Sequence, residues 1–277
     1  MTAGLRELVF VVADKAMQQL LEGFFGRDQF HHTLGCGPFE FDPRPNRDVF
    51  VAAGQHDSGL YTRAAELLRP HRATHKRAIV LVDADWAGSP GAVQVGRRIA
   101  AGVAHVWDER FFQVIVLDPE VEAWLWQPDS PHLAAALNYR AAKPYQQVLA
   151  EAGYWPADHP KPPRPKEARD YLRRAHRTDP SNAVFKRAAA KISVQGCTDP
   201  AFLLLCASPR LVPERGSMKT TDLDSPVRLQ WLLDQNARLD ARPYVGGAHE
   251  ARLIAADRAT GAGRRARRGR RGRRRTG

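Results

Sequence analysis

Short apolar runs rich in β-branched residues alternate with helix-compatible segments over residues 7–126. Apolar runs of about four to eight residues bounded by turn residues are typical of buried strands, whereas apolar positions spaced three and four apart favour helices. From about residue 128 onward, short helix-compatible segments are separated by proline-rich turns. The predicted strands are 7–12, 48–54, 78–86 and 111–117, and the predicted helices of this half are 16–25, 60–71, 92–104 and the segment that carries Glu120 and Glu122.

The segment 78–86 (AIVLVDADW) is the strongest strand prediction in the chain. It is apolar without interruption through Val82, which indicates burial on both faces, as in the centre of a parallel sheet. Alternation of strands and helices favours a parallel, doubly wound arrangement. In such sheets the functional groups gather at the carboxyl ends of the strands. The sequence therefore predicts an α/β fold with a mostly parallel sheet and places its chemistry at that edge.

The second half of the chain predicts helices and then a change of character. The predicted helices lie near 130–138, 143–152, 165–176, 181–193 and 197–206. The connector 156–168 is stiff because proline fixes φ. The arginine- and glycine-rich end of the chain is a composition that cannot pack a core. We interpret 1–127 as an α/β core, 128–207 as a helical cap packed on it, 208–260 as a poorly defined extension and 261–277 as a disordered tail.

The net charge of +12 is concentrated in that tail. Nine arginines and no acidic residue lie between Arg264 and Arg275, so about +3 remains for the rest of the chain. The body is therefore only mildly basic, and the overall charge does not indicate a DNA-binding body. The apolar runs are too short to predict a membrane span or a signal peptide, and three cysteines without metal-ligand spacing favour a reducing cytoplasm.

Asp83 and Asp85 end the strongest predicted strand and are the first candidates for a metal site. Alternate residues of a strand point to the same face, so the two carboxylates can converge on one ion if strand geometry persists to its end. Hard oxygen ligands of this kind suit Mg²⁺ or Mn²⁺. The alternative is that the Asp-Ala-Asp segment simply ends a strand and caps the next helix.

Further acidic residues follow two other predicted strands. Asp118 ends the strand 111–117, and Glu120 and Glu122 open the helix that follows. Acidic strand ends of one parallel sheet can face the same crevice, where like charges repel unless a cation or a basic side chain neutralises them. The alternatives are a cap before Pro119 for Asp118 and an ordinary first-turn glutamate for Glu122. Asp14, after the first strand, is a candidate ligand or the cap of the next helix.

Basic groups near the strand ends are candidates to contact a substrate phosphate. These are Lys15, His56 and Lys166. His56 precedes a helix and is a potential general base or phosphate contact, with an exposed loop histidine as the alternative. Lys166, beside the proline-rich connector, could reach over the strand ends or belong to a solvated basic turn. The sequence contains no phosphate-binding glycine loop, zinc cluster, nucleophile elbow or dinucleotide fingerprint, which excludes several common enzyme classes.

Six ordered segments resemble a known family. LVFVVADKAMQQLLEGFF, QHDSGLY, IVLVDADWAGSP, VIVLDPEVEAWLW, PKPPRPKEA and CTDPAFLLL occur in an order similar to a small protein of bacterial methylation-associated phage-defence systems, which is related to Toprim-like domains of unknown function. The resemblance covers about residues 7–205. It implies a Rossmann-like parallel sheet that binds Mg²⁺ through a glutamate after the first strand and a DxD after a later one.

Asp83 and Asp85 match the DxD of Toprim domains. The glutamate does not match, because Ala13 and Asp14 stand at its position and only Asp14 could substitute for it. Glu120 falls in a P-E-x-E-A-W segment that looks like the corresponding part of the defence-associated relatives. The stretch after Pro209 is unlike that family, and its composition is typical of a lineage-specific or frameshifted extension.

The resemblance and the acidic strand ends together predict a defence-system nuclease that uses Mg²⁺ or Mn²⁺ to act on DNA phosphodiesters. Asp83, Asp85, Glu120 and Asp14 would act in catalysis, and Asp118 would join Asp83, Asp85 and Glu120 as a metal ligand. The missing glutamate and the nearly neutral body favour an alternative, a non-catalytic assembly or sensing subunit of a defence complex. A third possibility is that only the arginine-rich tail contacts nucleic acid.

Overall fold

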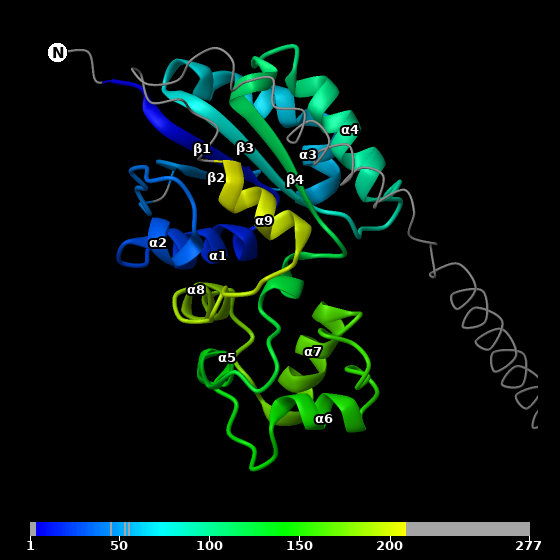
Figure 1. Cartoon of the computed structure of the whole chain (residues 1–277). Helices are drawn as coiled ribbons and strands as arrows, with labels where there is room; N and C mark the ends of the chain where they lie inside the picture. Colours follow the sequence, from blue (N-terminus) through cyan, green and yellow to red (C-terminus); the bar gives the residue numbers. More distant parts are fainter. Residues whose placement is uncertain (1–3, 45, 53, 55, 209–277) are drawn as a thin grey trace, which may run out of the picture. The chain divides into compact units, whose positions relative to one another are not determined.

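The computed structural model describes residues 4–208 except residues 45, 53 and 55, and its centre is a four-stranded parallel sheet (Figure 1). The strand order is β2-β1-β3-β4, and each neighbouring pair is parallel. The predicted α/β class with a parallel sheet is therefore confirmed. The predicted extension and tail lie outside the described residues, apart from Ser208. The strands are β1 (Arg6–Val12), β2 (Val49–Val51), β3 (His75–Asp83) and β4 (Phe112–Leu117).

The two central strands are buried on both faces, as their uninterrupted apolar runs predict. In β3 every residue from Arg77 to Asp83 is buried, and in β1 the same holds from Leu8 to Val12. The register pairs Val12 of β1 with Val51 of β2 on one side and with Leu81 of β3 on the other. The carboxyl ends of the strands consequently finish at one edge of the sheet.

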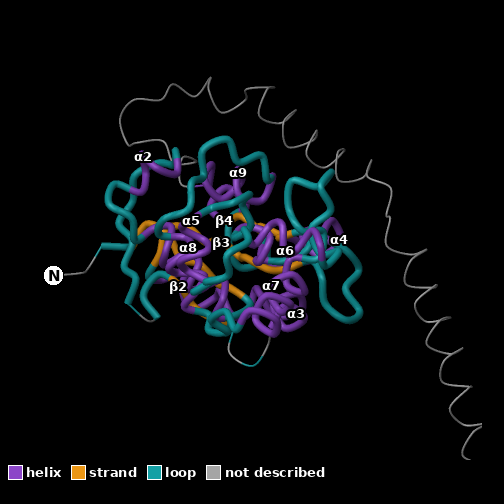
Figure 2. The backbone as a smooth tube through the Cα atoms, turned by 90° about the horizontal axis from the view of Figure 1, so that it is seen from below, coloured by secondary structure: helices purple, strands orange, loops and turns teal. Residues whose placement is uncertain are grey.

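Helices cover both faces of the sheet. On one face α3 (His56–Leu68) and α4 (Ala92–Val103) pack against the strands and each other, and on the opposite face lie α1 (Lys15–Phe25) and α9 (Pro200–Ala207). Figures 1 and 2 show this arrangement from two directions. In α4 the buried residues are Val95, Ile99 and Val103, whose spacing of four predicts one apolar stripe on a helix.

The segment after the sheet is helical and has an aromatic core of its own. Trp126, Tyr145 and Trp155 are almost completely buried, and their ring centroids lie 5.8 to 6.4 Å apart. Such aromatic groups bury large apolar areas and stabilise the packing of short helices. The helices agree with the predicted ones within a few residues: α5 (Pro131–Leu137), α6 (Tyr145–Glu151), α7 (Pro165–His176) and α8 (Ala183–Ala189).

Close packing of α1 against α8 connects the helical segment to the sheet layer. Gly23 is needed at this contact, because a Cβ atom there would lie 2.5 Å from the carbonyl oxygen of Lys186. The guanidinium of Arg27 donates hydrogen bonds to the carbonyl oxygens of Ala189 and Ile192, with Nε–O and Nη2–O distances of 2.8 Å. Arg27 therefore binds the carbonyl group of the last residue of α8 and one in the turn that follows the helix.

Three local predictions differ from the structure. The predicted loop 31–47 overlaps a short helix, α2 (Phe30–Leu34), and the Phe30 ring packs against those of Phe25 and Phe39. The predicted strand 48–54 is only three residues long. The predicted helix at Glu120 is one 3-10 turn, η3 (Val121–Trp124), because every residue of that turn is buried and the amphipathic pattern of a longer helix is absent. Two further 3-10 turns are η1 (Arg69–Ala73) and η2 (Glu109–Phe111).

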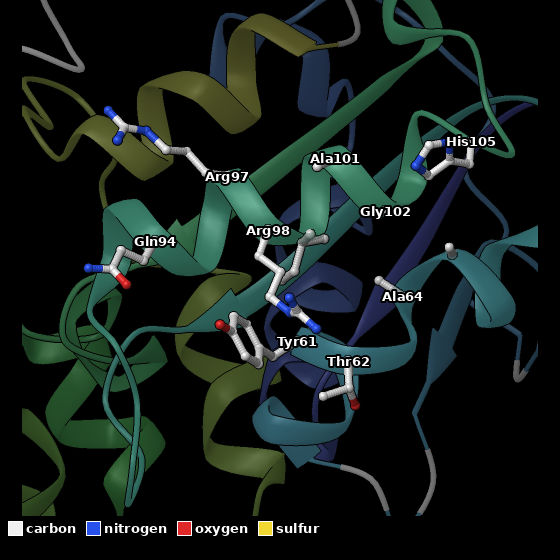
Figure 3. A pocket seen from close by; sticks show the side chains of 11 residues that line it. Tyr61, Thr62, Ala64, Gln94, Arg97, Arg98, Ala101, Gly102 and His105 are labelled. Carbon is white, nitrogen blue, oxygen red and sulfur yellow. The ribbon is translucent and has the colours of Figure 1, made fainter.

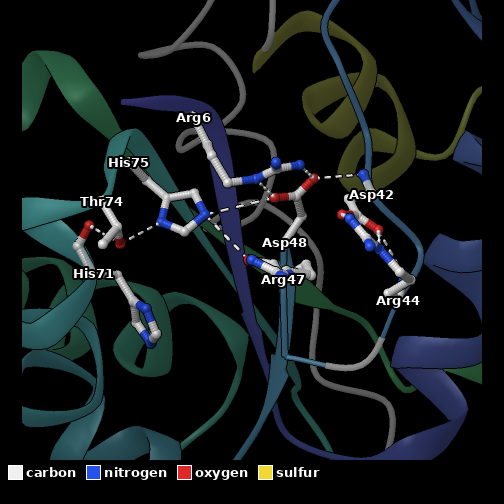
Figure 4. A network of polar contacts seen from close by, with 8 residues as sticks. All are labelled: Arg6, Asp42, Arg44, Arg47, Asp48, His71, Thr74 and His75. Carbon is white, nitrogen blue, oxygen red and sulfur yellow. Dashed lines mark hydrogen bonds and ion pairs between the residues drawn. The ribbon is translucent and has the colours of Figure 1, made fainter. Parts of the chain in front are cut away.

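A buried ionic network joins the amino-terminal ends of β1, β2 and β3 (Figure 4). Asp48, only 1% exposed, accepts hydrogen bonds from Arg6 Nε at 2.5 Å and Arg6 Nη2 at 2.7 Å, and its Oδ1 lies 3.5 Å from His75 Nε2. The amide of Asp42 donates to Asp48 Oδ2 at 2.6 Å. Burial acts to raise the pKa of Asp48, but the hydrogen bonds from Arg6, His75 and the Asp42 amide outweigh it and lower that pKa.

Asp48→Asn should destabilise the protein, because the substitution leaves the half-buried Arg6 and the buried His75 without their charged partner. Since Arg6 remains 30% exposed, we expect the free energy of unfolding to fall by about 2–3 kcal/mol in urea denaturation at pH 7. The contribution of Asp48 is present above the ordinary aspartate pKa and is lost as the pH falls through the lowered pKa, so the difference should shrink in acid. Glu66→Gln, which removes an exposed pair with Arg63, serves as the control and should leave the unfolding midpoint unchanged. Equal midpoints for the two variants at pH 7 would contradict the assignment.

Candidate functional site

Acidic side chains follow all four strands at the carboxyl edge of the sheet. Asp83 ends β3, Asp14 follows β1, and Asp57 lies in the first turn of α3, the helix after β2. Glu120 and Glu122 lie in the segment after β4. We call these five residues the acidic edge. Their charges are close enough to act on one another, since Asp57, Glu122, Asp14 and Glu120 all raise the pKa of Asp83.

Asp83 lies at the centre of the acidic edge and is only 8% exposed. Its Oδ1 accepts a hydrogen bond from the Val121 amide at 2.8 Å, and its own amide donates to Asp57 Oδ1 at 2.8 Å. Burial first, and then the neighbouring carboxylates, raise the pKa of Asp83 well above its usual value. Burial likewise raises the pKa of Asp57, against the hydrogen bond that it accepts from the Asp83 amide. The two groups therefore hold protons at a pH where an exposed aspartate is charged.

Glu120 has a pKa in the range where proton transfer at neutral pH is effective. Burial raises this pKa to about 7, Glu122 adds to the effect, and the backbone hydrogen bond from Lys166 opposes it. That bond runs from the Lys166 amide to Glu120 Oε1 at 2.8 Å. Burial also raises the pKa of Glu122. Arg169, whose Nη1 lies 3.4 Å from Glu122 Oε1, acts to lower it.

The helix α7 brings positive charge to this edge. Lys166 is exposed, and Glu122, Glu120, Asp83 and Asp14 raise the pKa of its ammonium group against the lowering effect of burial. Arg169 lies three residues later on α7, about one helical turn away, and pairs with Glu122. Lys166 therefore acts on four of the five carboxyl groups of the acidic edge, and Arg169 adds a second positive charge beside Glu122.

The other residues singled out in the sequence lie around this cluster and not inside it. The strand geometry that would align Asp83 with Asp85 does not persist: β3 ends at Asp83, and the Ala84 and Asp85 amides turn to donate to the Pro119 carbonyl oxygen at 3.1 and 3.0 Å. Asp85 is therefore exposed, although its charge still raises the pKa of Glu120. Asp118 is exposed, and the residue at the N-cap position of η3 is Glu120.

The structure shows local hydrogen bonds for Asp14 and Lys15 and an exposed side chain for His56. Asp14 caps α1, and its Oδ1 accepts a hydrogen bond from the Met17 amide at 2.9 Å, as the capping alternative predicts. Lys15 is exposed and donates to Gln18 Oε1 at 2.6 Å. His56 is exposed at the start of α3 with a φ of 49°.

Sequence reasoning missed Asp57 and Arg169 as members of the site. Asp57 lies in the first turn of α3, and its side chain contacts the end of a strand two elements away. A signal exists in the sequence, because Asp57 follows β2 just as the other acidic residues follow their strands. Arg169 carries no local signal, since its partner Glu122 is distant in the sequence and is reached only through the packing of α7 against η3.

The donor chemistry of the acidic edge fits a hard divalent cation. Its ligands would all be carboxylate oxygens. Burial raises the pKa values of Asp83, Glu120 and Glu122 because it disfavours their charged forms, and a bound cation would favour those forms again. Within the described part of the chain, no three His, Cys, Asp or Glu side chains already form a group that could hold a metal ion. The hydrogen bonds from the Val121 and Lys166 amides engage one oxygen each of Asp83 and Glu120, so Oδ2 and Oε2 are the oxygens best suited to a cation.

No model of a known protein family, no curated protein and no solved structure matches this chain. The protein is an α/β protein with a four-stranded parallel sheet and an acidic carboxyl edge. Among the described residues, no helix is long and apolar enough to cross a membrane.

The raised pKa values predict that stability decreases as the pH rises. A carboxyl group with a raised pKa binds more protons in the folded than in the unfolded state, so its stabilising effect is lost as the pH rises from about 4.5 through the folded value near 7 for Glu120. The contribution of Glu120 to the free energy of unfolding should fall by about 2–3 kcal/mol between pH 5 and pH 8, measured by urea denaturation.

Glu120→Gln tests that assignment. The amide oxygen can still accept the Lys166 hydrogen bond, but the titration is removed, so the variant should lose much of the pH dependence. Glu167→Gln, an exposed first-turn residue of α7 paired with Arg164, is the matched control and should keep the dependence of the wild type. If Glu120→Gln retains the full dependence, the pKa of Glu120 is not raised as described.

Proposed function

We propose that this protein is a Mg²⁺- or Mn²⁺-dependent phosphodiester-processing protein that acts on DNA as a component of a bacterial phage-defence system. The acidic edge carries the proposal, because a carboxyl group follows each of the four parallel strands and those of Asp83 and Glu120 have raised pKa values. The sheet and the order of motifs are consistent with a Toprim-like core. The defence role and the expected partner subunits rest on the resemblance of the motifs.

Asp83 and Glu120 would hold the cation, with Asp14 or Glu122 completing the oxygen ligands. A cation bound there would polarise a phosphodiester and lower the pKa of an attacking water. Asp85 and Asp118 are exposed and would act at the rim of the site, where either could contact the outer coordination waters.

The residues of the chain itself would supply proton transfer and phosphate binding. Glu120, with a pKa of about 7, would release its proton from Oε2 near neutral pH and so make that oxygen available to the cation. The exposed side chain of Lys166, whose pKa Glu120 and Glu122 raise, could bind a phosphate oxygen as a point charge. Lys15 and His56 are exposed near the same edge and could extend this phosphate contact.

A non-catalytic assembly or sensing role is the second candidate, and one observation favours it. Asp14, which stands where Toprim domains have their glutamate, is hydrogen-bonded as the cap of α1. In that role the acidic edge would respond to a cation or to pH without cleaving a substrate. The two functions differ in whether cation binding is accompanied by cleavage.

Mg²⁺ or Mn²⁺ should raise the thermal unfolding temperature of the wild-type protein. At about 100 times its dissociation constant, a ligand of the folded state contributes about 2.7 kcal/mol. Because protons compete for the same carboxylates, the effect should be larger at pH 8 than at pH 5.5. The protein should also cleave labelled DNA in the presence of the cation and stop when EDTA is added.

Asp83→Asn should abolish both the stabilisation by the cation and the cleavage of DNA. The variant should remain folded, because asparagine resembles the protonated form of this buried carboxyl group. Asp28→Asn, an exposed aspartate beyond the far end of α1, is the matched control and should behave as the wild type. Stabilisation without cleavage in the wild type would favour the sensing role. Cleavage that survives in Asp83→Asn would refute the proposed site.

A further inference from the structure

A hollow of about 600 Å³ lies between α3 and α4, on the face of the sheet away from α1 (Figure 3). It is separate from the acidic edge, since none of the five acidic residues lines it. Small residues facing each other across the two helices leave this space open, namely Ala64 and Ala65 on α3 and Ala101 and Gly102 on α4. We call it the α3–α4 groove.

Basic and neutral side chains line the groove. Arg97, Arg98 and His105 contribute to its wall from α4 and the turn after it, and among the described residues no Asp or Glu belongs to the lining. The remaining polar lining residues are Tyr61, Thr62 and Gln94, whose hydroxyl and amide groups can bond to an anion. A surface of this composition attracts negatively charged ligands.

Arg98 is the central basic group of the groove. Its guanidinium extends from α4 towards α3 and lies 5.3 Å from the ring centroid of Tyr61 (Figure 3). Within residues 4–208, as far as they are described, no carboxylate forms an ion pair with Arg98, whereas Arg63 on α3 pairs with Glu66 at 2.7 Å. Stacking on an aromatic ring orients a guanidinium but leaves its in-plane donors available, and these match the geometry of a phosphate.

One end of the groove lies close to the acidic edge. Asp57, which accepts the Asp83 amide, is four residues before Tyr61 on α3, so the two side chains lie on one helix face about one turn apart. The Tyr61 ring centroid is 5.9 Å from that of Trp86, which directly follows Asp85 in the sequence. Tyr61 and Trp86 thus stand between the carboxylates and Arg98.

The length of the groove suits a chain of phosphates better than a single one. From Gln94 to Gly102 the helix α4 rises about 12 Å, at about 1.5 Å per residue. That length exceeds the width of one phosphate group, so the groove can contact more than one phosphate of a nucleic-acid strand. Arg98 and His105 lie seven residues apart on this helix and its end, which is about two turns.

We propose that the α3–α4 groove binds the sugar–phosphate backbone of a nucleic-acid strand and guides it away from the acidic edge. Arg98 would contact one phosphate and His105 a second, with Gln94 and Thr62 as neutral donors. The path of the nucleic-acid strand from the acidic edge past Tyr61 rests on the proposed function of that edge. Binding of the strand in the groove is independent of the proposed function, because it needs neither a cation nor cleavage.

Binding of a labelled 12-nucleotide DNA to the full chain, followed by fluorescence anisotropy in EDTA at several salt concentrations, tests the contribution of Arg98. Arg98→Gln should weaken binding about three- to tenfold and lower the slope of log affinity against log salt by about 0.7, as expected for the loss of one phosphate contact. Arg63→Gln removes the same charge outside the groove and should change neither value appreciably. The arginine-rich C-terminal segment is present in every variant and affects them equally.

A second measurement locates the strand directly. Ala101→Cys places a thiol in the groove, and Ala175→Cys places one at an exposed position of α7. The DNA should slow alkylation of the first thiol at least threefold and leave the second unchanged, as followed by peptide mass spectrometry. Equal rates at Ala101→Cys with and without DNA would overturn the proposal, whatever the result with Arg98→Gln.

Two further measurements distinguish strand binding in the groove from a mononucleotide pocket and from binding at the acidic edge. A mononucleotide at the same nucleotide concentration should protect Ala101→Cys much less than the 12-mer; equal protection would mean a mononucleotide pocket and would overturn the binding of a strand. Asp83→Asn should retain groove protection while it loses cleavage. A variant that loses only cleavage therefore has a defect at the acidic edge. A variant that loses only the protection of the thiol has a defect in the groove.

Discussion

Burial of like charges at the carboxyl edge of the sheet is the constraint on which the rest of this structure depends. Parallel pairing brings the ends of the strands together, and the chain places a carboxyl group after each of them. Around Asp83 the surrounding protein excludes water, so each added negative charge raises the pKa of its neighbours. Such an arrangement favours any species that brings positive charge, whether a proton, a basic side chain or a cation.

The helical segment provides part of that positive charge, which gives it a role beyond covering the sheet. The packing of α8 on α1 and of α7 on η3 fixes the first turn of α7 beside Glu120 and Glu122. Lys166 and Arg169 therefore depend on the segment after residue 128 for their position. On the opposite face the groove between α3 and α4 is lined by Arg97, Arg98 and His105, and none of the five residues of the acidic edge lines it.

The sequence predicted the elements wherever a local pattern was sufficient. The uninterrupted apolar run of β3 and the four-residue spacing in α4 determine a strand and a helix by themselves. The prediction was less accurate where a contact with a distant segment decides the local structure. Phe30 forms part of a helix because Phe25 and Phe39 pack against it, and the chain turns after Asp83 because the Pro119 carbonyl accepts its next amides.

From the sequence alone follow the α/β class, the parallel sheet and the presence of acidic residues after the strands, because these depend on periodicity and on strand ends. Only the tertiary structure decides that Asp83 is buried while Asp85 is exposed, that Asp57 joins the edge, and that Lys166 meets Glu120. It also decides that α3 and α4 leave a groove beside Arg98. The physical reason is that the free energy of a charge depends on which distant segments exclude water from it or pair with it, and no local pattern contains that information.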